Sequence, residues 1–322
     1  MPWQASIKLS YSLPLAITKL LLFWLSSEPM TTLRSLLHET SLPKNEARLV
    51  LAHLLEIHLQ LPQSALLTHD DMALSTVFVA EWVLLEQRRL QGEPIAYLIG
   101  KRGFHAIELM VGPGVLIPRP ETELLVDLGL DELQSTINKE NGLNESEHSL
   151  NMLDLGTGSG AIALAIAAGQ PNVTVVATDA SQTALDIAQQ NAAHLKLSDR
   201  LSFCLGHWYA ALHTLDSSPR HFDLILSNPP YIAVNDPHLS KGDLRFEPPS
   251  ALTDFGSGLT CLATIIDGAL AHLKPGGLLA VEHGFDQSPA VLEQLAMAGF
   301  QDITPHRDLA GHWRVASGRK PV

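Results

Sequence analysis

Apolar positions in the first part of the chain recur with helical spacing. Between Met30 and about Gly103 they follow one another at steps of three and four residues, beginning after Pro43, a residue that a first helical turn tolerates. The first stripe consists of Ala47, Val50, Leu51, Leu54 and Leu55. A second helix is expected from Leu74 to Leu90. Its inward residues are expected to be Val77, Leu84 and Leu85. The pattern predicts a small helical-bundle domain over residues 30–103.

Short apolar strands alternate with helical stretches from Glu121 onward, which implies an α/β sheet. The clearest strands are Met152–Leu155, Val173–Thr178, Leu201–Leu205, Phe222–Ser227 and Gly277–Glu282. The polar stretch from Gln134 to Ser149 predicts a surface loop. Between the two regions, residues 104–120 are interrupted by Gly112-Pro113-Gly114 and predict a hairpin that links the domains.

Composition narrows the classes of function. The chain has 322 residues, of which 46% are hydrophobic, enough for a core domain with a smaller one beside it. Its formal charge of −13 disfavours a protein that neutralises phosphates, so no direct nucleic-acid partner is expected. Cys204 and Cys261 lie far apart, and the histidines lack metal-ligand spacing. We therefore expect a cytoplasmic protein with no metal site, and a monomer.

The start of the chain is apolar from Leu13 to Leu25, with Lys19 inside the run. The run is too short and too interrupted to span a bilayer, and no small-residue cleavage site follows it. We expect Met30 to be the true initiator and residues 1–29 to be a non-native extension. A membrane anchor is the alternative.

A glycine-rich loop follows the first predicted strand and opens an alanine-rich helix, Ala161 to Ala168. The loop reads Gly156-Thr157-Gly158-Ser159-Gly160. Such loops let a ligand approach bare backbone, but several nucleotide-binding chemistries share them. Its glycine spacing meets the dinucleotide pattern only if Ala161 stands in the last place. Asp154, at the loop entrance, would repel a pyrophosphate but could accept hydrogen bonds from a ligand ammonium group.

A second acidic residue, Asp179, ends the next predicted strand. A carboxylate at that place can accept hydrogen bonds from both ribose hydroxyls of an adenosine. Asp179 could also cap the helix expected from Ser181 to Asn191. Together with the glycine loop it predicts a nucleoside site. S-adenosylmethionine is favoured over NAD as the cofactor, because it carries an ammonium group and lacks phosphates.

The tetrapeptide Asn228-Pro229-Pro230-Tyr231 ends the fourth predicted strand, at the sheet edge where open α/β sheets bind ligands. Its prolines, Pro229 and Pro230, fix the backbone and remove two amide donors, which leaves carbonyls free to accept. A planar NH2 group could donate to the Asn228 side-chain oxygen and to a carbonyl near Pro229, while Tyr231 stacks on the substrate. A rigid proline turn is the alternative. The tetrapeptide predicts methylation of an amide or amine nitrogen, catalysed mainly by positioning.

With these residues the chain resembles the peptide chain release factor glutamine methyltransferases, the HemK/PrmC family, over nearly everything from Met30. Further matching motifs are Gly92-Glu93-Pro94-Ile95-Ala96-Tyr97, Leu116-Ile117-Pro118-Arg119-Pro120-Glu121-Thr122-Glu123, Asp236-Pro237-His238-Leu239, Gly242-Asp243-Leu244-Arg245-Phe246-Glu247-Pro248 and Glu282-His283-Gly284. The resemblance implies a Rossmann-like class I methyltransferase domain over residues 121–322, a hairpin linker over 104–120, and a helical domain over 30–103 that docks the substrate. It also implies methylation of the glutamine amide in the Gly-Gly-Gln loop of class I release factors.

By position, the resemblance implies that residues 156–160 and Asp179 bind S-adenosylmethionine, with Trp208 near the adenine. Asn228 would touch both the cofactor and the glutamine. A tryptophan that follows a strand is also common in protein cores, so Trp208 has a structural alternative.

Some residues depart from the family or have two interpretations. His207 stands where the family commonly has Asp, and Gly103 stands where Glu usually precedes Phe104. Arg119 and Glu123 either form a structural ion pair or line a substrate channel.

Three other functions remain open from sequence alone. A DNA adenine N(6) methyltransferase also needs an acceptor pocket for a planar NH2, but would require a basic DNA-facing region that the acidic charge does not support. Glutamine methylation of a ribosomal protein by the sister family is closer; the segment Arg245-Phe246-Glu247-Pro248 favours a release factor instead. A non-catalytic nucleoside-binding module would have no need of Asn228.

Overall fold

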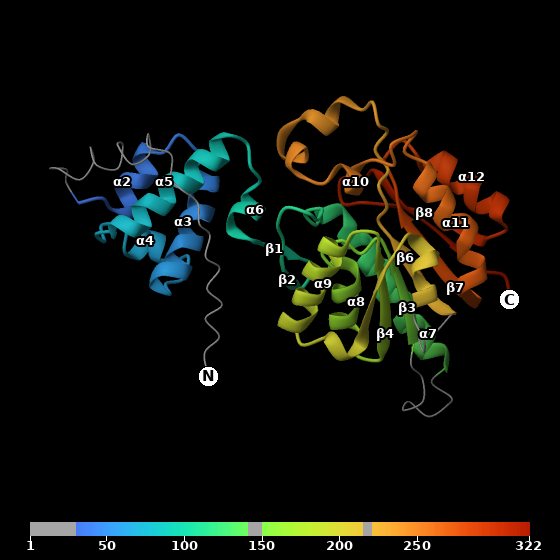
Figure 1. Cartoon of the computed structure of the whole chain (residues 1–322). Helices are drawn as coiled ribbons and strands as arrows, with labels where there is room; N and C mark the ends of the chain where they lie inside the picture. Colours follow the sequence, from blue (N-terminus) through green and yellow to red (C-terminus); the bar gives the residue numbers. More distant parts are fainter. Residues whose placement is uncertain (1–29, 141–149, 215–220) are drawn as a thin grey trace. The chain divides into compact units, whose positions relative to one another are not determined.

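The computed structural model describes residues 30–140, 150–214 and 221–322. These residues form two compact units, which divide between Ile99 and Gly100 (Figure 1). The expectations for residues 1–29, including the start at Met30, lie outside the described residues and stay predictions. None of the helices in the described part of the chain is long and apolar enough to cross a membrane.

The first unit is helical, as the pattern of apolar residues predicts. Its helices are α2 (Leu33–Glu39), α3 (Lys44–Leu59), α4 (Ala65–Thr68), α5 (Thr76–Leu90) and α6 (Ile95–Ile99). Helix α3 begins directly after Pro43, and its predicted stripe is confirmed, because all five apolar residues of the stripe are 0% exposed. The stripe forms the centre of this unit's core, together with residues of α2 and α5.

Helix α5 buries a different face from the predicted one. Leu85 is buried as expected, but the inward prediction is wrong for Val77 and Leu84, which are 63% and 43% exposed. Phe78 and Trp82 are buried instead, at steps of four and three residues to Leu85. The two aromatic side chains remove more apolar area from water than Val77 and Leu84 would, so they determine which face is buried.

The second unit begins with an antiparallel hairpin of β1 (Lys101–Phe104) and β2 (Ile107–Met110). The hairpin predicted at 104–120 is therefore placed several residues too late. Its tight turn has His105 in the left-handed region, at φ +50°, and the His105 backbone N–H donates to Glu123 Oε1 at 3.0 Å. Gly112-Pro113-Gly114 belongs to the connection after the hairpin.

A seven-stranded sheet forms the centre of the second unit, in the order β5-β4-β3-β6-β7-β9-β8. Its strands are β3 (Leu150–Leu155), β4 (Val173–Asp179), β5 (Leu201–Leu205), β6 (Phe222–Ser227), β7 (Leu273–Glu282), β8 (Gln301–Arg307) and β9 (Trp313–Arg319). The five predicted strands are confirmed and pair in parallel. The last two were not predicted, and they extend the sheet in antiparallel fashion.

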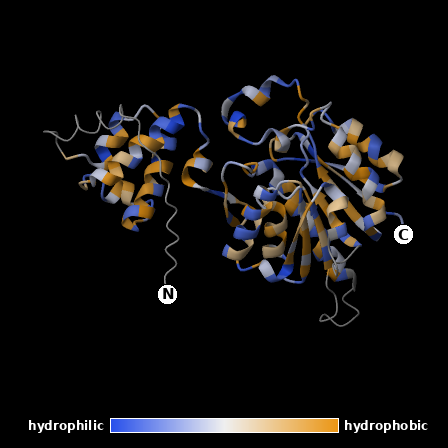
Figure 2. Cartoon of the chain, viewed as in Figure 1, coloured by the Kyte–Doolittle hydropathy of each residue, from blue (hydrophilic) through white to orange (hydrophobic). Residues whose placement is uncertain are grey.

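Helices cover both faces of the sheet, so the predicted α/β class is confirmed (Figure 1). The helices are α7 (Glu123–Glu140), α8 (Ala161–Gly169), α9 (Gln182–His194), α10 (Pro249–Leu252), α11 (Thr260–His272) and α12 (Ser288–Ala298). Successive residues of β3 serve opposite faces: Met152 packs in the core with α7 and α8, and Leu153 in the core with α11 and α12. Figure 2 shows the central strands as the most continuously apolar part of the unit.

Helix α7 extends into a stretch that its polar composition predicts as a loop. The prediction of a loop from Gln134 is wrong as far as Glu140, where the helix ends; residues 141–149 lie outside the described residues. Val126, Leu133 and Ile137 pack against one core at helical spacing, although the residues between them are polar. The buried stripe, rather than the mean composition, determines the structure here.

Alanine substitutions of the neighbouring residues Leu84 and Leu85 test which face of α5 is buried. We expect Leu85→Ala to lower the free energy of unfolding by about 2–5 kcal/mol, because it leaves a cavity in the core. Leu84→Ala should cost less than about 1 kcal/mol, because Leu84 is exposed. Urea unfolding of the full chain, followed by fluorescence of the buried Trp82, would measure both. Equal losses would contradict the observed orientation of α5.

Candidate functional site

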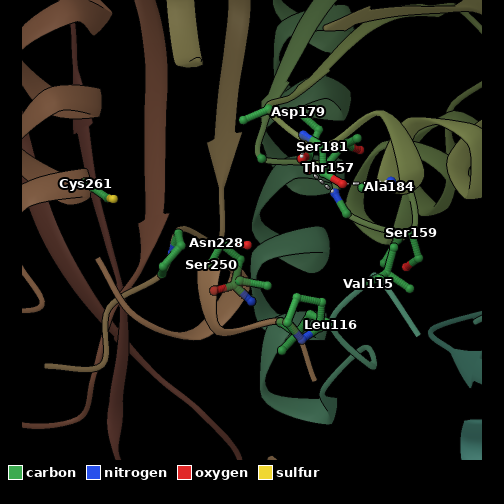
Figure 3. Close-up of a pocket in the computed structure, with 18 of the residues that line it drawn as sticks. Val115, Leu116, Thr157, Ser159, Asp179, Ser181, Ala184, Asn228, Ser250 and Cys261 are labelled. Carbon is green, nitrogen blue, oxygen red and sulfur yellow. Dashed lines mark hydrogen bonds between the residues drawn. The ribbon is translucent and has the colours of Figure 1, made fainter. Parts of the chain in front are cut away.

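A cavity opens where the order of the strands reverses, between β3 and β6. Strands β4 and β5 lie on one side of this point and β7 on the other, so the loops after β3 and β6 diverge and leave a crevice. The cavity has a volume of about 450 Å³, within the usual range for small-molecule sites. Its walls come from the connection before α7, the glycine loop, the ends of β4, β5 and β6, and the segment around α10 (Figure 3).

The glycine loop is held by hydrogen bonds to its own protein. The N–H groups of Gly156 and Thr157 both donate to the Thr178 carbonyl, at 2.9 Å each. Gly158 N–H donates to Asp179 Oδ2 at 2.9 Å, and Gly160 N–H donates to the Thr157 carbonyl. Four of the five loop amides are thus occupied. A loop of this kind offers few donors to a phosphate, which disfavours a dinucleotide.

Asp154 supports the loop from beneath and does not line the cavity. The expectation that it accepts hydrogen bonds from a ligand is therefore wrong. It is completely buried, and its Oδ2 accepts hydrogen bonds from the Thr157 hydroxyl at 2.6 Å and from Ala163 N–H at 3.2 Å. Burial raises its pKa to about 7. The carboxyl connects the loop to the first turn of α8.

The other predicted acidic residue, Asp179, does line the cavity. Its Oδ1 accepts a hydrogen bond from Ser181 N–H at 2.8 Å, and burial raises its pKa while three backbone hydrogen bonds act in the opposite direction. Asp179 does not cap the next helix; Ser181 does, accepting from Ala184 N–H at 3.2 Å. The carboxylate is thus fixed by the glycine loop and by the start of α9, and it faces the cavity near Thr157 and Ser181 (Figure 3).

Trp208 and Gly156 meet at the cavity wall. A Cβ added to Gly156, which has φ +76°, would lie 3.3 Å from Cζ3 of Trp208, so the indole ring packs directly on the loop. Trp208 also packs against the core beneath α11 and α12, as the structural alternative expects. Its contact with the adenine stays a prediction. His207 lies beside it on the cavity wall and is exposed.

The tetrapeptide divides between the cavity and the interior. Asn228 and Pro230 line the cavity, whereas Pro229 is buried. Asn228 Nδ2 donates to Thr122 Oγ1 at 3.0 Å, which leaves Asn228 Oδ1 as the acceptor of its amide group.

Tyr231 faces away from the cavity. Its hydroxyl donates to Glu282 Oε1 at 3.0 Å, its ring packs against the core, and it is not among the cavity-lining residues. The expectation that this ring stacks on the substrate is therefore not met in the structure. The Tyr231 carbonyl accepts from Gln287 Nε2 at 2.9 Å, so the end of the tetrapeptide is held in place.

Arg119 and Glu123 do not form the expected ion pair with each other; Arg119 lines the cavity, and Glu123 does not. Arg119 lines the cavity and forms an ion pair with Glu247, whose carboxylate also accepts from Ile117 N–H at 2.9 Å. Glu247 is buried, so this pair ties the connection before α7 to the segment before α10. Glu123 instead binds the hairpin turn through His105.

Four buried polar residues that support the site were given no role from sequence: Thr122, Asn191, Glu247 and Glu282. Asn191 shows why they matter, because its Oδ1 accepts from Met110 N–H at 2.7 Å and its Nδ2 donates to the Ser159 carbonyl at 2.9 Å. All but Asn191 lie in motifs quoted above for the resemblance. In the sequence, the presence of these three residues in the family motifs was the signal that pointed to a role.

The arrangement fits a nucleoside that carries no phosphate. Asp179 provides an acceptor for hydroxyl groups, Trp208 a flat apolar wall, and Gly156 the close approach that a side chain would block. Among the described residues, no group of three or more His, Cys, Asp or Glu side chains is placed to hold a metal ion. An acceptor for hydroxyl groups, a flat apolar wall and unobstructed backbone suit the nucleoside part of S-adenosylmethionine.

Comparison with known proteins agrees with the fold. A family model described as a methyltransferase domain matches residues 146–303, and one described as the PrmC N-terminal domain matches residues 30–100. The fold and site define a class I methyltransferase whose methyl donor is S-adenosylmethionine.

Relatives of high identity define the family. Release factor glutamine methyltransferases from Bordetella pertussis, Xylella fastidiosa and Burkholderia pseudomallei are 45%, 47% and 44% identical to the chain. The matches cover 90%, 80% and 90% of this chain and 99%, 87% and 96% of the relatives. The chain belongs to the family of release factor glutamine methyltransferases.

Asp154 should make stability depend on pH. Its folded-state pKa of about 7 lies above the ordinary value of 3.8, so the folded state binds the proton more tightly and loses stability as pH rises between these values. Asp154→Asn removes this loss. From about pH 5 to about pH 8, the stability of the variant relative to the natural protein should therefore rise by about 2–3 kcal/mol.

Urea unfolding at both pH values would measure this difference. Asp186→Asn, on the exposed side of α9, is the matched control for replacing a carboxylate by an amide. A flat difference for Asp154→Asn would show that the carboxyl titrates normally.

Proposed function

We propose that the protein transfers the methyl group of S-adenosylmethionine to the side-chain amide nitrogen of the glutamine in the Gly-Gly-Gln motif of class I release factors, and so modulates translation termination. The observation that carries this proposal is Asn228, which lies at the cavity with its Nδ2 engaged by Thr122 and its Oδ1 left to accept from an amide. The names of the relatives support the release factor as substrate.

The cofactor contacts follow from the cavity walls. Asp179 would accept from the ribose hydroxyls, the loop from Gly156 to Gly160 would lie along the nucleoside, and Trp208 would face the adenine. The bound cofactor supplies a methyl group already activated by the positive sulfonium. The protein therefore has to hold the two reactants and exclude water.

The nucleophile is a poor one, because an amide nitrogen delocalises its lone pair into the carbonyl. Asn228 Oδ1 would accept one N–H of the substrate amide, and a carbonyl in the Pro229-Pro230 segment would accept the other. Two acceptors fix the nitrogen and draw electron density onto it. Such positioning can contribute roughly 7–11 kcal/mol to lowering the barrier. After transfer the amide nitrogen is still protonated and carries a positive charge. Its proton is acidic enough to pass to water without a dedicated base.

The exposed surface suits a protein substrate. Phe255 lines the cavity and is 63% exposed, so it presents an apolar rim to an incoming loop. In the first unit, Leu67, Val77 and Leu90 are exposed apolar residues, and we expect this unit to help dock the release factor. The protein is proposed to act as a cytoplasmic monomer. It is also proposed to act without nucleic acid, since its net charge is −13.

Methyl transfer to the release factor can be tested directly. Purified protein would be incubated with radiolabelled S-adenosylmethionine and a release factor that carries Gln or Ala in the Gly-Gly-Gln motif. We expect label only on the Gln form. Equal labelling of both forms, or labelling only of ribosomal protein or DNA offered in parallel, would contradict the proposal.

Two variants should separate cofactor binding from transfer. Asn228→Ala should lower kcat by about 100-fold or more while changing the Kd for S-adenosylmethionine by less than about threefold. Asp179→Asn should raise that Kd by about 10-fold or more, because it weakens charge-assisted hydrogen bonds to the ribose. Calorimetry and single-turnover transfer would measure the two quantities. Loss of both together in either variant would refute the division of roles.

A further inference from the structure

Phe255 combines an exposed aromatic ring with a backbone conformation that bulky residues rarely adopt. Its side chain lines the cavity and is 63% exposed, so the ring stands at the boundary between the cavity and solvent. Its φ is +57°, in the left-handed region, where glycine and asparagine are favoured and a bulky side chain is strained. Phe255 belongs to none of the hydrophobic cores of the described residues, so burial of the ring does not offset this strain.

Hydrogen bonds of the surrounding loop impose the conformation of Phe255. The Phe255 N–H donates to Thr253 Oγ1 at 3.0 Å. The Asp254 carboxylate accepts from three N–H groups of the turn that follows: those of Gly256 at 2.8 Å, Gly258 at 2.9 Å and Thr260 at 2.9 Å. The backbone is thus fixed on both sides of Phe255, and with it the direction of the Cα–Cβ bond that carries the ring. Strain that is imposed in this way is typical of residues that serve binding.

The same loop is tied to the tetrapeptide Asn228–Tyr231 and to the segment that follows it. Two backbone hydrogen bonds join the segments: Ile232 N–H to the Leu252 carbonyl at 3.0 Å and Val234 N–H to the Gly256 carbonyl at 3.1 Å. Gln287 Nε2 bridges them as well, because it donates to the Tyr231 carbonyl at 2.9 Å and to the Gly258 carbonyl at 3.2 Å. Phe255 is therefore held at a fixed place relative to the tetrapeptide.

The size of the cavity places the main chain of a protein substrate beside Phe255. At about 450 Å³ the cavity has the volume of a small-molecule site, so it can admit a side chain but not a loop of a protein. A glutamine has only two methylene groups between its main chain and its amide. With that amide at Asn228, the main chain on either side of the glutamine lies at the edge of the cavity. The exposed ring of Phe255 offers a flat apolar face there, against which planar peptide groups can pack.

On the basis of the methyl transfer proposed above, we propose that Phe255 is a substrate-binding residue, whose ring packs against the main chain that flanks the target glutamine of the release factor. The loop holds the ring exposed at a cost in stability, and binding of the substrate removes the ring from water. The contact is the same before and during methyl transfer. Phe255 therefore acts on the KM for the release factor and not on kcat.

Three substitutions of Phe255 separate the ring from the backbone conformation. Phe255→Gly and Phe255→Asn both suit a φ of +57° but remove the ring, whereas Phe255→Tyr keeps it. The first two should raise the KM for the release factor about 10-fold, with kcat and the Kd for S-adenosylmethionine within about threefold of the natural values. Phe255→Tyr should keep KM within about threefold. Because Phe255→Gly also relieves the strain, its Tm should rise by about 1–4 °C.

Phe285→Asn is the matched control, because Phe285 is 62% exposed but does not line the cavity, and it should leave KM unchanged. A KM within twofold of the natural value for Phe255→Gly would overturn the proposal. So would a fall in Tm that accompanies the rise in KM, which indicates a structural role, or an equal rise in the Kd for S-adenosylmethionine, which assigns the ring to the cofactor. If the natural protein does not label the Gln form of the release factor, the proposed function fails instead, and the two failures are distinguishable.

Discussion

The parallel pairing of β3 with β6 is the constraint on which the rest of the site depends. These two strands are far apart in sequence, but they lie side by side where the strand order reverses, with Leu155 opposite Ser227. The Ser227 hydroxyl donates to the Leu155 carbonyl at 2.6 Å, which ties the two strand ends together. The glycine loop and the tetrapeptide continue directly from these residues. A shift of one residue in this register would turn Asn228 away from the cavity.

Polar groups buried beneath the cavity hold its loops in place. The loops leave the sheet without the ladder of hydrogen bonds that a strand has, so buried side chains supply partners. Asp154 and Glu247 accept from backbone and side-chain donors, and Asn191 donates to the Ser159 carbonyl. Burial makes these bonds strong, and it makes the loss of one partner costly. It also raises the pKa of Asp154 and of Glu282 to about 7. The rigidity of the site is thus obtained with carboxyls that are costly to ionise.

The parts of the fold that could be predicted are those where burial follows a simple period. The five parallel strands are continuous apolar runs, because both of their faces are covered. Strands β8 and β9 show no such run: β8 is mostly polar, contains Pro305 and forms the edge of the sheet, while β9 carries small and charged residues. Their assignment depends on pairing with β7, which no local pattern shows. The buried face of α5 depends likewise on which large side chains the bundle accommodates.

The residues of the site likewise fall into those that a local sequence pattern predicts and those that depend on tertiary packing. The location of residues 156–159, Asp179 and Asn228 at the cavity could be predicted, because the carboxyl ends of the strands follow from the position of the strands. The contacts of Thr122 and Glu282 were not, since their hydrogen bonds with Asn228 and Tyr231 depend on the packing of the segment before α7 and on the register of β6 and β7. For Asp154, the sequence predicted a ligand contact that the structure does not show. Its charge suggested a ligand contact, yet it is the loop amides, already bound to Thr178 and Asp179, that disfavour a phosphate. The choice between S-adenosylmethionine and a dinucleotide therefore follows from which backbone donors remain free, a property that only the folded structure displays.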